Sequence, residues 1–114
     1  MDDLAAVRRH TRHHAAGLDE DRARDLITAV TELATNILVH GGGPGTLRTW
    51  HEPGPLICEV SGPGHITGPL AVRHPPSASP HGGHGLRLVS QLCDLTQQRT
   101  SPAGTTTRVH MRIS

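Results

Sequence analysis

Three polar side chains recur every four residues in one stretch of the chain, namely Glu32, Asn36 and His40. An α-helix turns by about 100° per residue, so this spacing places them in a single stripe. The stripe borders an apolar face and has the small Ala29 among its members. A carboxylate and an amide at the edge of a hydrophobic core suit a ligand pocket, and an amide oxygen is a hard donor of the kind that Mg²⁺ prefers. A solvated helix flank produces the same pattern, so the stripe alone leaves both interpretations open.

Glycine-rich segments follow at three later points of the sequence. Ser61-Gly62-Pro63-Gly64 comes directly after a predicted strand, Gly82-Gly83-His84-Gly85-Leu86 opens a predicted helix, and Gly104-Thr105 opens the last predicted strand. A glycine-rich loop that runs into a helix N-terminus is a ready anion site, because unpaired N–H groups and the positive end of the helix dipole face the ligand. The second segment therefore predicts an anion site.

Other residue groups offer weaker alternatives. His10, His13 and His14 lie on one predicted helix and could chelate a metal ion. No carboxylate or cysteine completes a ligand set there, so a solvated helix face is the preferred interpretation. Cys58 and Cys93 are far apart without CxxC spacing, which indicates free thiols in a reducing compartment.

The elements that must position these residues can be predicted from periodicity. Apolar residues at Leu26, Val30, Leu33 and Ile37 give the clearest helix, which begins after a predicted N-cap at Asp19 and stops at the glycine run following His40. Trp50 is interpreted as core or sheet-face packing. The predicted order is a helix over 4–16, a helix to about 40, strands 46–51 and 56–60, a loop over 61–84, a helix over 85–93, and strands 95–99 and 105–113. This order predicts an α+β two-layer sandwich with an antiparallel or mixed sheet and helices on one face.

Length and composition limit the class of protein. The 114 residues allow one domain, predicted to span 1–114, and the hydrophobic fraction is 34%. No apolar run approaches the roughly 20 residues that span a bilayer, and the acidic start is not a secretory signal, so we expect a cytoplasmic protein. The net charge of +1 gives no general attraction to nucleic acid.

Taken in order, these segments resemble the motifs of the GHKL ATPase superfamily, whose fold is the Bergerat or histidine kinase-like ATPase fold. Residues 31–43 (TELATNILVHGGG) resemble the N box, 58–64 (CEVSGPG) the G1 box, 82–92 (GGHGLRLVSQL) the G2 box and 104–111 (GTTTRVHM) the G3 region. Among these proteins the chain looks most like actinobacterial anti-sigma factor serine/threonine kinases.

The resemblance implies ATP and Mg²⁺ as cofactors and a role for each matching residue. Asn36 would bind Mg²⁺, and Glu32 would be the general base, which fits the logic of phosphoryl transfer. Residues 65–84 would form the ATP lid. The other implied nucleotide-binding residues are His40 near the phosphates, Gly62 and Gly64 at the adenine turn, Gly82, Gly83, Gly85 and Leu86 at the phosphates, and Thr105 in the adenine subsite.

One position departs from the motif. The G1 box of the family is D-x-G, and its Asp accepts a hydrogen bond from adenine, whereas this chain has Gly62 there. Loss of a hydrogen bond to a charged acceptor costs about 1.5–3 kcal/mol, or roughly 10- to 100-fold in affinity.

Two functions therefore remain open. The resemblance implies an ATP/Mg²⁺-binding regulator that sequesters a sigma factor and phosphorylates Ser or Thr of an anti-anti-sigma (STAS-type) protein, with a homodimer as the expected assembly. The alternative is a non-catalytic interaction module of the same fold, with weak or no ATP binding because of Gly62. Neither reading includes a nucleic-acid or membrane partner.

Overall fold

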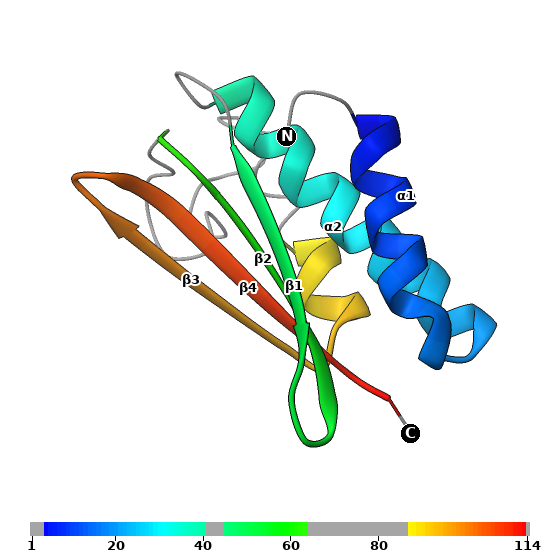
Figure 1. The fold of residues 1–114 in the computed structure, drawn as a ribbon. Helices are drawn as coiled ribbons and strands as arrows, with labels where there is room; N and C mark the ends of the chain where they lie inside the picture. Colours follow the sequence, from blue (N-terminus) through cyan, green and yellow to red (C-terminus); the bar gives the residue numbers. More distant parts are fainter. Residues whose placement is uncertain (1–3, 41–44, 64–86, 114) are drawn as a thin grey trace.

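The computed structural model describes residues 4–40, 45–63 and 87–113, and for 38–40 it describes the backbone only. Two long helices lie together on one side of the sheet (Figure 1). The elements are α1 (Leu4–His14), a 3₁₀ turn η1 (Ala15–Gly17), α2 (Glu20–His40), β1 (Thr46–His51), β2 (Pro55–Gly62), β3 (Leu95–Ser101) and β4 (Gly104–Arg112).

The helix α2 begins and ends where the sequence predicts. The backbone N–H of Arg22 donates to Oδ1 of Asp19 at 2.9 Å, so Asp19 is the N-cap. Residues 87–92 are also helical, within the helix that the spacing predicts over 85–93. Among the described residues, no helix has the length and apolar character needed to cross a membrane.

The four strands form one antiparallel sheet in the order β1-β2-β4-β3. This confirms the predicted α+β fold and both predicted hairpins. The predicted strand over 56–60 is longer in the structure, because β2 continues through Ser61 and Gly62. The prediction that a loop begins at residue 61 is wrong, since Gly62 pairs with Thr105 of β4 and the ladder hydrogen bonds extend that far.

The core lies between the sheet and the helices. The predicted helix stripe is buried, with exposures of 0% for Leu26 and Val30, 3% for Leu33 and 4% for Ile37. It packs against alternate residues of the central strands, namely Leu56, Cys58 and Val60 of β2 and Val109 and Met111 of β4. The period of two along a strand leaves the other residues of β2 and β4 on the opposite face.

Polar contacts fix the helices on this face. Nε2 of His10 lies 3.0 Å from Oγ1 of Thr49, which joins α1 to β1. Nη2 of Arg22 donates to Oδ2 of Asp94 at 2.5 Å, and Nε donates to the carbonyl of Arg112 at 3.2 Å. These bonds hold the first turn of α2 against the beginning of β3 and the end of β4.

Candidate functional site

The polar stripe of α2 is partly buried. Asn36 is 3% exposed, and its Nδ2 has no hydrogen-bond partner among the described residues. A buried amide of this kind costs free energy unless a partner is supplied, so Asn36 is the strongest single indication of a ligand. Glu32, one turn earlier, is half-buried, and His40 is the last residue of α2. Of the histidines that were a weaker metal-site alternative on α1, His14 has its Nδ1 3.0 Å from the carbonyl oxygen of His10.

A second part of the site is formed where β2 ends beside the start of β4. Gly62 and Thr105, both predicted nucleotide-binding residues, are register partners. Thr105 is 1% exposed, and its Oγ1 lies 3.3 Å from that of Thr100. The two partners line a hollow of about 490 Å³ together with Thr46, Ser61, Pro63, Ser101, Ala103, Gly104 and Thr106.

The strand ends approach each other too closely for side chains. Gly104 has a φ of +138°, a conformation that L residues rarely adopt. A β-carbon there would overlap the carbonyl oxygen of Gly62. Glycine at position 104 is therefore required by the fold itself, whatever binds in the hollow.

Ile37 connects the helix to this corner. A β-carbon built on Gly62 would lie 2.6 Å from Cγ2 and 3.2 Å from Cδ1 of Ile37. The residue next to Asn36 therefore packs directly onto the end of β2, and the predicted N-box and G1-box segments come together. The apolar spacing predicts that Ile37 lies in the core, but it does not predict the contact with Gly62. The signal that could have indicated this contact is the combination of a bulky residue after Asn36 with glycine, rather than a carboxylate, at position 62.

Several predicted residues lie outside the described part of the chain. They are Gly64, Gly82, Gly83, Gly85 and Leu86, together with the predicted lid over 65–84. The side chain of His40 is also outside it. Their predicted roles stay predictions.

The described side chains also bear on whether the protein alone could hold a metal ion. Within 4–37, 45–63 and 87–113, no group of three or more His, Cys, Asp or Glu side chains is arranged to hold a metal ion. Mg²⁺ shared with a nucleotide needs fewer protein donors, because substrate phosphates and water supply the rest.

The order of these elements, together with the packing of α2 against the end of β2, is typical of one domain type. A family model described as the histidine kinase-like ATPase domain matches residues 1–111. The chain belongs to the histidine kinase-like ATPase family. A comparison with curated proteins gave no match.

The phosphate side and the adenine side of the family's nucleotide site differ in how well the described residues of this ATPase domain suit a nucleotide. On the phosphate side, Asn36 presents a buried amide with an unpaired nitrogen among the described residues, which fits a ligand. On the adenine side, Gly62 provides no carboxylate, and Ile37 fills the space into which a side chain at position 62 would project. The described residues therefore fit the phosphates of a nucleotide better than they fit its base.

Proposed function

We propose that this histidine kinase-like ATPase domain is an ATP/Mg²⁺-binding regulator of the anti-sigma factor type. It sequesters a sigma factor and transfers phosphate to Ser or Thr of a STAS-type antagonist protein. The observation that carries the proposal is the buried amide of Asn36, whose Nδ2 is unpaired among the described residues. A phosphate oxygen of a bound nucleotide could accept a hydrogen bond from that nitrogen, and the amide oxygen of Asn36 would be the ligand for Mg²⁺.

The catalytic assignment rests on the helix geometry. Glu32 lies one turn before Asn36 on α2 and is half-buried. Phosphoryl transfer depends chiefly on positioning and charge neutralisation, and a carboxylate near the metal can orient the attacking hydroxyl. We assign Glu32 this role of general base and Asn36 the role of Mg²⁺ ligand.

A specific observation favours a second candidate. Ile37 packs into the position that an adenine-binding carboxylate would need at residue 62. A protein with this change could keep the fold as a non-catalytic interaction module with weak or no ATP binding. The same contact is equally consistent with a nucleotide held mainly by its phosphates.

Calorimetric titration with ATP in the presence and absence of Mg²⁺ separates the two candidates. For the regulator we expect Mg²⁺-dependent binding that Asn36→Ala weakens by about 10- to 100-fold, as loss of a metal-site residue does. Thr35→Ala is the matched control, because within the described part of the chain Oγ1 of Thr35 donates to the carbonyl of Thr31 in its own helix, at 2.8 Å. Thermal unfolding of each variant verifies that it remains folded.

Catalysis needs a separate measurement. Glu32→Gln should retain ATP binding while phosphate transfer to a purified STAS-type protein falls by at least about 100-fold, the contribution of a general base. Absence of ATP binding by the native chain at millimolar concentrations would favour the non-catalytic module. Binding without transfer, unchanged by Glu32→Gln, would remove the kinase assignment only.

A further inference from the structure

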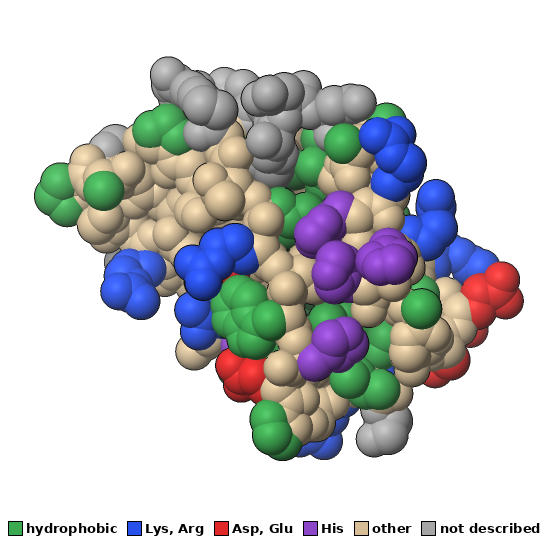
Figure 2. All heavy atoms as spheres, viewed as in Figure 1, with side chains coloured by type: hydrophobic (Ala, Val, Ile, Leu, Met, Phe, Trp, Pro, Cys, Tyr) green, Lys and Arg blue, Asp and Glu red, His purple; other side chains and the backbone are tan. Residues whose placement is uncertain are grey.

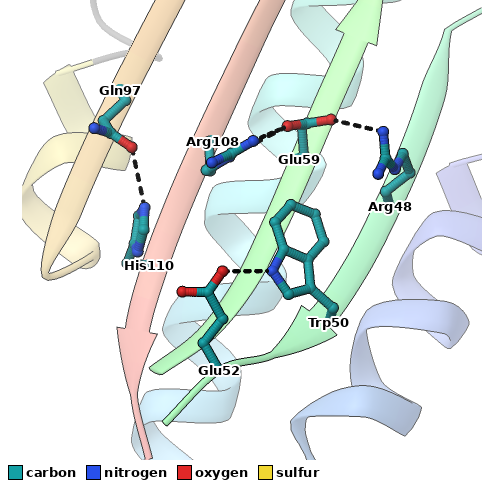
Figure 3. Close-up of polar contacts among 7 residues, drawn as sticks. All are labelled: Arg48, Trp50, Glu52, Glu59, Gln97, Arg108 and His110. Atoms are coloured by element: carbon teal, nitrogen blue, oxygen red, sulfur yellow. Dashed lines mark hydrogen bonds and ion pairs between the residues drawn. The ribbon is translucent and has the colours of Figure 1, made fainter. Parts of the chain in front are cut away.

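The sheet face opposite the helices has an ordered group of charged and aromatic side chains (Figure 3). The indole ring of Trp50 lies close to two guanidinium groups, with Cζ of Arg48 5.6 Å and Cζ of Arg108 5.1 Å from its ring centre. Both distances are within the range of cation–π attraction. The indole N–H donates to Oε2 of Glu52 at 2.9 Å. Four side chains from two strands and a turn are thus held in one arrangement.

Glu59 anchors this arrangement from the middle of the sheet. Its side chain is 9% exposed, and its Oε2 accepts from Nη2 and Nε of Arg108 at 2.7 and 3.2 Å. Its Oε1 lies 3.5 Å from Nη1 of Arg48. A nearly buried carboxylate with two arginines restricts the rotamers of both. That restriction lowers the side-chain entropy that the two arginines would otherwise lose when a partner binds.

The arginines retain binding capacity. A guanidinium carries five N–H donors, and Glu59 engages one nitrogen of Arg48 and two of Arg108. The side chains of Arg48 and Arg108 are 67% and 39% exposed. Donors therefore remain on the solvent side of both groups.

The positive charge extends across the sheet. Arg99 of the edge strand β3 lines a hollow of about 240 Å³ with Glu59, Arg108, Gln97, Gln98 and Thr106. On the same face, Leu95 pairs with His110 and is 48% exposed. Figure 2 shows basic side chains gathered beside a hydrophobic one over this part of the sheet. We call the residues Arg48, Trp50, Arg99 and Arg108 the Arg–Trp face.

We propose that the Arg–Trp face docks an acidic segment of a partner protein. Its carboxylates would pair with the three arginines, and its apolar side chains would contact Trp50. Arginine and tryptophan are the residue types most often responsible for binding energy at protein interfaces. None of these four residues lines the hollow at Gly62 and Thr105, so the proposal does not rest on ATP binding.

Charge also argues against the two other occupants. A two-fold dimer through this face would bring two sets of the same three arginines into one interface, and like charges held close together cost several kcal/mol. For nucleic acid, the chain's net charge of +1 supplies little of the general attraction on which binding to a polyanionic backbone depends.

Trp50 provides the test, since the chain has one Trp and no Tyr, and its fluorescence reports on this face alone. The probe is a short synthetic peptide of alternating Glu and Leu, titrated into the full chain. We expect a saturable change in Trp50 emission that added salt weakens. Arg48→Gln/Arg99→Gln should lower the affinity about tenfold, while Arg24→Gln, which removes one exposed charge on α2 and away from this face, should leave it unchanged.

Four outcomes would overturn the proposal. The first is no saturable change with the acidic peptide, and the second is equal weakening in Arg24→Gln. The third is preferential binding of a Lys–Leu peptide or a single-stranded oligonucleotide. The fourth is dimerisation of the free chain through this face in sedimentation experiments. Arg99→Gln alone provides a further check, because the Glu59 ion pairs remain in that variant.

Discussion

Ile37 on α2 and Gly62 at the end of β2 fit each other as a pair. A β-carbon on Gly62 would lie 2.6 Å from Cγ2 of Ile37, closer than two carbon atoms can approach without displacement. Ile37 is 4% exposed, so it has little freedom to move aside. The absence of a carboxylate in the G1 segment is therefore coupled to the bulky residue that follows Asn36.

The first prediction concerns the stability of this pair. Gly62→Ala should lower the free energy of unfolding by about 1–3 kcal/mol, the usual cost of overpacking. In an Ile37→Ala background the same substitution should cost at least about 1 kcal/mol less, because the space has been opened. Urea unfolding of the four proteins measures this coupling.

Gly17→Ala is the matched control for the glycine effect. A β-carbon at Gly17 meets only Cγ2 of Ile113, at 3.9 Å, which is an ordinary contact. We expect a change of less than about 1 kcal/mol there. Equal destabilisation at positions 17 and 62, or strict additivity with Ile37→Ala, would show that the contact has no energetic role.

The second prediction is a pH dependence that arises at His10. Burial, followed by the nearby His14 and His13, lowers the pKa of His10 from its ordinary value of 6.5. The unfolded chain therefore binds more protons at that position than the folded chain does. The free energy of unfolding should keep its full value above pH 6.5 and decline as the pH falls below it. Unfolding midpoints measured from about pH 5 to pH 8 would show this slope.

His10→Gln separates this effect from the other histidines. The variant should lose less stability than the native chain between neutral and acidic pH, because the titrating group is gone. It also weakens the bond to Thr49 that joins α1 to β1, so its stability at neutral pH should be lower. Parallel pH profiles for the two proteins would contradict the assignment to His10.

The third prediction concerns the two free cysteines. Burial raises the pKa of Cys58 to about 11 and that of Cys93 to about 12. The thiolate is the reactive form, so iodoacetamide at about pH 8 should modify both thiols slowly in the folded chain. Modification in urea should be much faster and serves as the control for reagent activity. Rapid labelling of either cysteine under native conditions would show that the core opens locally there.

Much of the fold could be predicted because its signals are local. The apolar spacing of α2, the cap at Asp19 and the turns of both hairpins depend on neighbours a few residues away. The end of β2 could not be predicted in the same way. Gly62 reads as a turn residue by itself, and only its pairing with Thr105 makes it part of a strand.

The amino-acid sequence by itself determined the order of elements, the buried stripe with Asn36 beside it, and the family's glycine segments. Tertiary structure alone decided which distant side chains meet. Ile37 with Gly62, and Glu59 with Arg48 and Arg108, are brought together by strand register and helix packing. A one-residue change of register would turn every side chain of a strand to the other face, so such contacts depend on the whole sheet rather than on local sequence.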